Sequence, residues 1–165
     1  MLKKLTVTFL VLCSLGTANA KVKERARTYH TCTSADTPQN ILACAMYFEA
    51  RSEGEKGMTY VGNVIMNRRN HDEYPSKMSK VVYQKHQFSY VRKRLKVQDK
   101  ISWDAAQRAA GKLLSMSDEK RRLTDPTKGA IYFTKKSTKR YWQRDKVLTA
   151  KYGKHVFYKD KLNAK

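Results

Sequence analysis

The sequence that decides the fold is PQNILACAMYFEARSEGEKGMTYVGNVIMNRR, residues 38–69. Its first half repeats apolar residues at the spacing of one helix face: Ile41, Leu42, Ala45, Met46 and Phe48. Glu49 continues this apolar face instead of lying on the solvated side. Pro38 suits the first helical turn, and Asp36 or Thr37 can cap it. The pattern predicts a buried helix from about Pro38 that carries one carboxyl group near its end.

A second helix is predicted over residues 58–69. The polar segment Ser52 to Gly57 contains two glycines and predicts a turn after the first helix. Beyond it, four residues share one helix side, namely Met58, Val61, Ile65 and Arg68. Gly62 lacks a side chain and permits close contact with a neighbouring helix.

The rest of the chain predicts shorter elements. We expect a short helix over 78–83, a short strand over 87–91 and a third long helix over 103–116. Strand-like segments follow at 129–134 and 155–158, with a turn at Gly153 before the second. The chain is therefore predicted to be α+β, mainly α, with a small β element on its C-terminal side.

The N-terminus has the pattern of a secretory signal peptide over residues 1–20. Lys3 and Lys4 precede an apolar run from Leu5 to Leu15, and the triplet ANA at 18–20 forms a small-x-small cleavage site. Retention of the run as an anchor is the alternative. We expect an exported protein of the periplasm or cell wall, with a basic arm over 21–37 and a catalytic domain over 38–160.

Two cysteines remain after the signal peptide, Cys32 and Cys44. An even number of cysteines in an exported protein favours a disulfide. This bond would join the N-terminal arm to the first helix. The alternative is one buried thiol and one exposed thiol.

The charge of the chain indicates a polyanionic partner. There are 35 Lys and Arg against 14 Asp and Glu, a net charge of +21. Such a charge attracts nucleic acid, anionic lipid or acidic cell-wall polymers. The basic residues are spread along the chain without a nucleic-acid-binding motif. We therefore expect anionic cell envelope polymers as partners, no specific nucleic acid and no stable protein partner. A secreted basic polyanion-binding protein without enzymatic activity is the non-enzyme alternative.

Several catalytic chemistries lack their usual motifs here. The four histidines, at 30, 71, 86 and 155, form no pair at spacing i, i+4 and no His-Glu-x-x-His motif, so we expect no metal or other cofactor. There is no Gly-x-Ser-x-Gly motif, and both cysteines are expected in a bridge. A buried carboxyl group remains, because burial raises its pKa and lets it act as a general acid. This indicates Glu49; the alternative is a structural ion pair with Arg51 or Arg68.

Motifs along the chain resemble the SleB/CwlJ family of cell wall hydrolases. The resemblance rests on segments that occur in order: FEARSE at 48–53, Gly57, 61–64, NR at 67–68, YP at 74–75, VVYQ at 81–84, QFS at 87–89, DP at 125–126, GA at 129–130, YF at 132–133, Trp142 and GKHVFY at 153–158. It covers roughly residues 41–158. Ser52 departs from the glycine that the family commonly has there.

The resemblance implies a lysozyme-like fold with a substrate cleft. It also implies peptidoglycan cleavage between N-acetylmuramic acid and N-acetylglucosamine, with Glu49 as the catalytic residue. A lytic transglycosylase needs only this carboxyl group and gives 1,6-anhydro products; a hydrolytic muramidase or an N-acetylmuramoyl-L-alanine amidase is the alternative. We expect the other matched residues to bind substrate: Asn67, Gln87, Phe88, Ser89, Tyr132, Trp142 and His155. The alternatives are helix capping by Asn67, core packing of a strand over 87–89, and core packing by Tyr132 and Trp142. Glu53 and Glu55 are expected in solvent, with a second carboxylate at one of them as the alternative.

Overall fold

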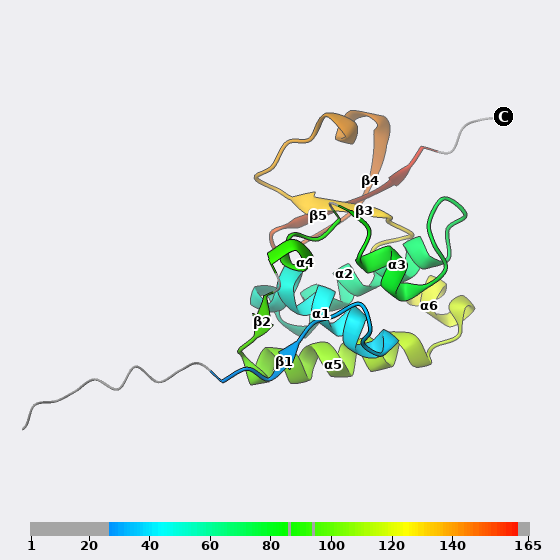
Figure 1. The fold of residues 1–165 in the computed structure, drawn as a ribbon. Helices are drawn as coiled ribbons and strands as arrows, with labels where there is room; N and C mark the ends of the chain where they lie inside the picture. The colour runs from blue at the N-terminus through cyan, green and yellow to red at the C-terminus, as the bar shows by residue number, and fades with distance from the viewer. Residues whose placement is uncertain (1–26, 86, 94, 162–165) are drawn as a thin grey trace, which may run out of the picture.

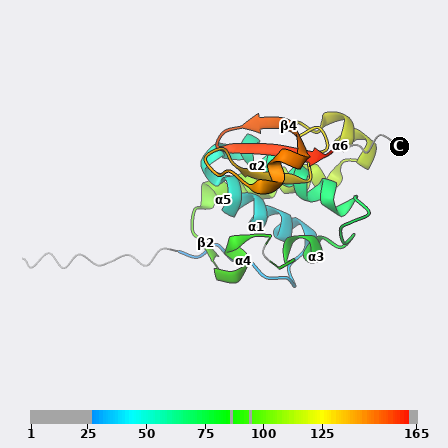
Figure 2. The same cartoon turned by 90° about the horizontal axis from the view of Figure 1, so that it is seen from above.

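The computed structural model describes residues 27–85, 87–93 and 95–161. The predicted signal peptide, the start of the basic arm and His86 lie outside the described residues. Helices α1 (Pro38–Ala50), α2 (Gly54–Arg69) and α5 (Lys100–Ser115) form the body of the domain. A three-stranded sheet lies over α1 and α2 on the side away from α5 (Figure 1, Figure 2). A mainly helical domain with a small β region is thus confirmed.

The hydrophobic core lies between the three long helices. Residues 41–47 of α1 are all buried. Gly62 of α2 lies close to both neighbouring helices: a Cβ there would lie 2.5 Å from Leu113 Cδ1 of α5 and 3.0 Å from Met46 Sδ of α1. The close contact predicted at Gly62 is confirmed, because a side chain there would displace the packed side chains of Leu113 and Met46.

The ends of α1 follow from its sequence. The Thr37 side chain caps the helix by accepting the Asn40 N–H at 3.3 Å. After Ala50 the chain forms one short 3₁₀ turn, η1 (Arg51–Glu53), and Gly54 then takes a φ of +68° that favours glycine. This single residue redirects the chain, so α2 begins at Gly54. The predicted start at Met58 was wrong because Glu55 and Lys56 form an exposed first helical turn rather than part of a loop.

The shorter helices agree in part with the predictions. Helix α3 (Met78–Val82) is close to its predicted range, and α5 begins three residues before the predicted Trp103, capped by Asp99. The strand predicted over 87–91 is wrong: residues 89–93 form helix α4 (Ser89–Lys93). Alternating burial over so few residues does not distinguish a strand from a helical turn. Helix α6 (Asp118–Thr124), capped by Ser117, was not predicted.

The sheet has the strand order β3-β5-β4 and is antiparallel. Its strands are β3 (Tyr132–Lys135), β4 (Lys146–Tyr152) and β5 (His155–Asp160), with the 3₁₀ turn η2 (Tyr141–Asp145) before β4. The turn predicted at Gly153 joins β4 to β5, and Gly153 has a φ of +49°. Strand β3 begins later than the predicted residue 129, and β4 was not predicted.

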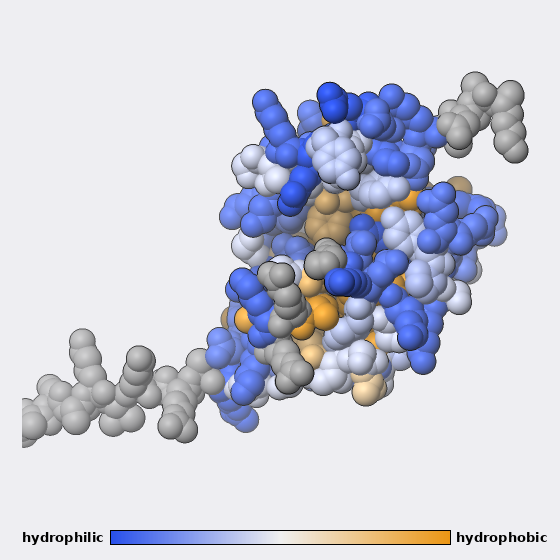
Figure 3. Space-filling model, turned by 45° about the horizontal axis from the view of Figure 1, so that its top comes forward, coloured by the Kyte–Doolittle hydropathy of each residue, from blue (hydrophilic) through white to orange (hydrophobic). Residues whose placement is uncertain are grey.

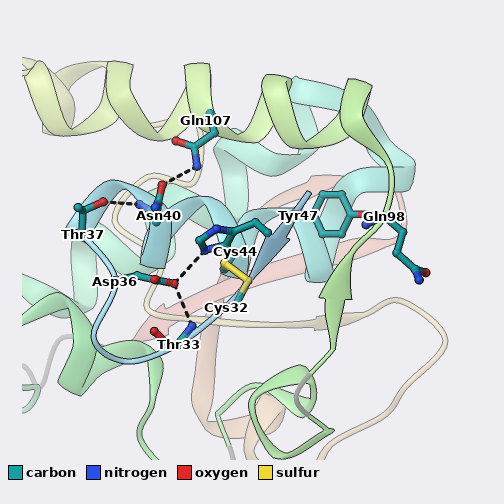
Figure 4. The surroundings of a disulfide bond; sticks show 10 residues. Cys32, Thr33, Asp36, Thr37, Asn40, Cys44, Tyr47, Gln98 and Gln107 are labelled. Atoms are coloured by element: carbon teal, nitrogen blue, oxygen red, sulfur yellow. Dashed lines mark hydrogen bonds and ion pairs between the residues drawn. A yellow bond between two sulfur atoms is a disulfide. The ribbon is translucent and has the colours of Figure 1, made fainter. Parts of the chain in front are cut away.

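A disulfide ties the N-terminal arm to α1. Cys32 and Cys44 are bonded, with their Cα atoms 6.1 Å apart, as predicted (Figure 4). The short strand β1 (His30–Thr31) pairs with β2 (Lys96–Val97). His30 also lies 2.9 Å from Asp36 and stacks on Trp103 of α5. These contacts hold residues 29–37 against the helical body.

None of the helices within the described ranges has the length and apolar character needed to cross a membrane.

Candidate active site

Glu49 is the penultimate residue of α1 and lies where the buried helix reaches the protein surface. Ala45 and Met46, one turn earlier, are completely buried, whereas Glu49 is half-buried. Among the described residues, no hydrogen bond or ion pair is formed by its carboxyl group. The alternative of a structural pair with Arg51 or Arg68 is therefore not what the structure shows. Arg51 is exposed and lies over the Tyr47 ring.

The environment of Glu49 favours its neutral form. Burial raises the pKa of the Glu49 carboxyl group, because the charged form loses hydration, and the positive charge of Lys135 opposes this rise. A carboxyl group with a raised pKa keeps its proton closer to neutral pH. It can then donate that proton to a leaving oxygen.

Three cavities meet at Glu49. The first, which we call the helical cavity, measures about 650 Å³ and lies beside α3 and α4. The second, the β cavity, measures about 810 Å³ and is lined mainly by β3 and the segment up to β4. The third, the hairpin cavity, measures about 220 Å³ and lies between the end of α1 with η1 and the β4–β5 turn. Figure 3 shows apolar side chains in a hollow between hydrophilic lobes. A substrate cleft with Glu49 at its centre fits this arrangement.

The predicted residues Gln87, Phe88 and Ser89 all line the helical cavity together with Glu49. Gln87 also lines the β cavity, so it stands where the two cavities join. Phe88 is almost fully buried, and its ring packs 6.1 Å from that of Tyr90. Gln87 and Ser89 are exposed and present polar groups to the cavity, while Phe88 provides an apolar wall.

Tyr132, Trp142 and His155 all line the β cavity. The rings of Tyr132 and Trp142 lie 5.6 Å apart, and Trp142 also packs edge-on against Tyr158 at 5.4 Å. Both aromatic side chains are partly exposed, so they combine packing on the sheet with a face toward the cavity. Packing and cavity lining are thus not exclusive at these two positions.

Asn67 lies away from this cleft and lines none of the three cavities around Glu49. Its side-chain N–H group donates to Asp125 Oδ2 at 2.8 Å and to the Ala130 carbonyl at 3.0 Å. Its oxygen accepts from Arg121 Nη1 at 2.7 Å. These bonds use both ends of the amide. They join α2 to α6 and to the segment before β3, and the substrate contact predicted for Asn67 stays a prediction.

The Glu53 side chain is buried, and the prediction that it lies in solvent is wrong. Its side chain is 6% exposed, and Oε1 lies 2.9 Å from His155 Nδ1 and accepts the Lys154 N–H at 2.9 Å. Burial lowers the pKa of His155, and the Glu53 charge opposes this effect. Two glycines make room for Glu53: a Cβ on Gly57 would lie 2.3 Å from its Cβ, and one on Gly153 2.5 Å from its Cδ. The spacing of Glu53 and Gly57, one helical turn apart, was the available signal.

Arg68 was also not identified from the sequence as part of the cleft. It is 6% exposed and lines the β cavity. Its Nε donates to the Ile131 carbonyl at 2.7 Å, and its Nη1 donates to Gln87 Oε1 at 2.8 Å. Burial lowers its pKa, yet an arginine starts so high that it keeps its charge. Arg68 thus fixes the position of Gln87 between the two cavities.

Among the described residues, one group of three side chains has the proximity needed to hold a metal ion: His30, Cys32 and Cys44. Its two sulfur atoms are joined to each other in the disulfide. A thiolate ligand is deprotonated and unbridged, so this group does not fit a metal site in the oxidised protein.

Comparisons with solved structures identify similar folds. The fold is similar to the crystal structure of the catalytic domain of the Bacillus cereus SleB protein, with a TM-score of 0.58 and 24% identity over 79% of this chain and 94% of that chain. It is also similar to the catalytic domain of the germination-specific lytic transglycosylase SleB from Bacillus anthracis, with a TM-score of 0.59 and 23% identity over 78% of this chain and 100% of that chain. These matches confirm the predicted lysozyme-like fold.

The search of curated proteins found no significant match. The family model for cell wall hydrolases matches residues 52–158, from η1 to β5, and begins just after α1 and Glu49. This match confirms the resemblance that the sequence motifs indicated. The chain belongs to the cell wall hydrolase family, whose members are enzymes that act on peptidoglycan.

Proposed function

We propose that this protein cleaves the glycan strand of peptidoglycan between N-acetylmuramic acid and N-acetylglucosamine, as a lytic transglycosylase with Glu49 as its single acid and base. One observation carries the proposal: the Glu49 carboxyl group is half-buried and unpaired among the described residues, at the point where three cavities meet. A glycan that crosses from the helical cavity into the β cavity passes this group.

In the proposed reaction, protonated Glu49 donates its proton to the glycosidic oxygen. The bond between this oxygen and C1 of muramic acid breaks, and positive charge develops at C1. The Glu49 carboxylate then accepts the proton of the muramic acid 6-hydroxyl group. The oxygen of that hydroxyl forms a bond to C1 and closes the 1,6-anhydro ring. Glu49 is protonated again at the end, and no water is consumed.

The surroundings of Glu49 favour this route over hydrolysis, which usually requires a second carboxylate to activate water or to attack C1. Among the described residues that line the three cavities, the second carboxylate is Glu53. Glu53 already lies against His155 and accepts the Lys154 N–H. The other acids near α2 lie outside these cavities: Glu55 pairs with Arg108, and Asp72 and Glu73 are exposed in the loop after α2.

The related fold supports the same reaction type. The Bacillus anthracis protein with a similar fold is described as a lytic transglycosylase. We extend that activity to this chain on the strength of the Glu49 geometry, and we do not extend the role in germination. In the proposed complex Gln87 and Ser89 hydrogen-bond the sugars, and Phe88, Tyr132 and Trp142 contact their apolar faces.

We also propose that the protein is exported and attracted to anionic cell envelope polymers. The predicted signal peptide and the disulfide between Cys32 and Cys44 support export, because such bonds persist in oxidising compartments. The net charge of +21 supports attraction to anionic polymers.

The test replaces Glu49 by Gln, which keeps the shape of the side chain but removes its acid and base function. Activity on purified peptidoglycan should fall by about 10²–10⁴-fold, the usual contribution of a positioned acid or base. The matched control is Glu55→Gln, because Glu55 is an exposed acid outside the three cavities. This control should keep nearly full activity, and both variants should retain the circular dichroism spectrum of the wild type.

Mass spectrometry of the products identifies the reaction. Wild-type enzyme should release fragments with 1,6-anhydro ends, and EDTA should not change the rate. Near-full activity of Glu49→Gln would show that the catalytic assignment is wrong. Reducing ends, together with loss of activity in Glu49→Gln, would identify a hydrolytic muramidase. Cleavage of the bond to the peptide, abolished by EDTA, would identify an amidase.

A further inference from the structure

The β cavity is unusually rich in positive charge. Its lining contains one carboxyl group, that of Glu49, which burial keeps closer to its neutral form. Its basic side chains come from α2, β3, β4, β5 and the segment before η2: Arg68, Lys135, Arg140, Lys146 and His155. The cavity on the other side of Glu49 contains fewer basic groups, Lys85 and Arg140.

Two of the basic groups in the β cavity have carboxylate partners. Lys146, at the start of β4, pairs with Asp160 at the end of β5. His155 lies against Glu53. The charge of Lys146 is therefore balanced within the protein, and burial favours the neutral form of His155.

The other three basic groups, Arg68, Lys135 and Arg140, form no ion pair with any carboxylate among the described residues. Lys135 and Arg140 are exposed, as is ordinary for surface cations. Arg68 is different, because its guanidinium group is buried and its partners are the Ile131 carbonyl, the Gln87 amide and the Tyr74 ring, all of them neutral. The general positive charge of this protein does not explain a buried cation, since burial without a counter-ion is unfavourable.

We propose that the β cavity binds a carboxylate of the glycan strand next to the bond that is cleaved, so that the enzyme prefers anionic over neutral strands. The inference rests on the proposed function and names its substrate class. Peptidoglycan offers this chemistry from two sources. One is the lactyl group of a muramic acid that has lost its peptide; the other is a carboxylate of an attached stem peptide.

The experiment compares matched strands that differ only in carboxylate charge. One pair consists of glycan strands without peptides, with lactyl carboxylates either free or converted to methylamides. The second pair carries stem peptides, with peptide carboxylates free or converted in the same way. Binding is measured with Glu49→Gln protein at physiological ionic strength, which screens distant charges. The cleavage rate, as kcat/KM, is measured with the wild type.

Arg140→Ala is the test variant and Lys139→Ala is its control. Both remove one exposed positive charge from adjacent positions, but Arg140 lines the β cavity and Lys139 does not. Arg68 is unsuitable for this purpose because it also holds Ile131 and Gln87. Free strands should bind about three- to tenfold more tightly than their methylamides. Arg140→Ala should reduce this preference, and Lys139→Ala should preserve it.

Each outcome decides the inference. Preference in the first pair identifies the lactyl carboxylate as the ligand, and preference confined to the second pair identifies a stem-peptide carboxylate; both support the proposal. Equal binding of free and neutral strands overturns it. An equal loss of preference in Arg140→Ala and Lys139→Ala also overturns it, because the effect would then come from overall charge. Charge-dependent binding without cleavage by the wild type would refute the proposed function and leave the carboxylate site in place.

Discussion

Replacing Gly57 by alanine tests whether the buried Glu53 fixes the junction between α1 and α2. Gly57 lies within α2, where alanine normally stabilises a helix by about 1 kcal/mol relative to glycine. Here the new Cβ would lie 2.3 Å from Glu53 Cβ and 2.9 Å from Glu53 Oε2. The Cβ of Glu53 is held by the backbone and cannot rotate away. We therefore expect Gly57→Ala to lower the stability of the protein.

The magnitude follows from three contributions. The helix preference contributes about 1 kcal/mol of stabilisation. Overpacking a buried site typically costs about 1–3 kcal/mol. Displacement of Glu53 breaks its bond from the Lys154 N–H, and hydrogen bonds to charged groups are worth about 1.5–3 kcal/mol. The net loss in the free energy of unfolding should be about 1.5–5 kcal/mol.

Urea denaturation measures this loss, with Gly111→Ala as the matched control. Gly111 also lies inside a long helix, α5, but a Cβ there would have the flexible end of Gln39 as its nearest neighbour, at 3.3 Å. This control should be neutral or more stable by up to about 1 kcal/mol. In a Glu53→Gly background, Gly57→Ala should no longer destabilise. Equal stability of Gly57→Ala and wild type would refute the packing argument.

Four further predictions concern the cleft, the fold and the substrate. Activity should be lost as the pH rises through the raised pKa of Glu49, because the proton donor is then lost. Lys135→Ala removes the charge that opposes this rise, so it should move the alkaline limb of the kcat profile to higher pH. An unmoved limb would show that the charge of Lys135 does not affect the pKa of Glu49. Asn67→Ala should lower the free energy of unfolding, measured in urea, by about 2–3 kcal/mol, because Asp125 and Arg121 each lose a hydrogen-bond partner. It should leave KM unchanged. A raised KM with unchanged stability would show that Asn67 binds substrate. Reduction of the disulfide between Cys32 and Cys44, which closes a short loop, should cost about 2–3 kcal/mol in the same assay, and titration of the unreduced, denatured protein should find no free thiol at these positions. The rate of cleavage of intact sacculi should fall steeply as the salt concentration rises, whereas the rate on short neutral fragments should not. Equal salt sensitivity of the two rates would mean that the positive charge does not direct the enzyme to the wall.

Local sequence patterns predicted much of the helical body. The start of α1, a cap at either Asp36 or Thr37, and the close packing at Gly62 all follow from residue preferences within one or two helical turns; the structure selects Thr37 as the cap. The position of Glu49 at the end of a buried face also follows from helical spacing. Periodicity over longer segments is informative because each additional turn repeats the same pattern.

Short elements were predicted less well. Residues 89–93 form a helix where a strand was expected, and β4 and α6 were not predicted at all. A segment of five to seven residues contains too few repeats to separate helical from strand spacing. Its conformation is decided by the partner against which it packs, such as β5 in the case of β4.

The sequence by itself determined the helical body, the cysteine pair and the single carboxyl group on an apolar helix face. Each of these depends on residues that are close along the chain or on the only two cysteines that follow the predicted signal peptide. The tertiary structure alone decided the roles of Glu53, Asn67 and Arg68. Glu53 bonds to a backbone N–H that lies 101 residues away, and Asn67 and Arg68 each bond to carbonyl groups 63 residues away. No local pattern encodes such partners, since burial of a polar side chain depends on which distant segment arrives to satisfy it.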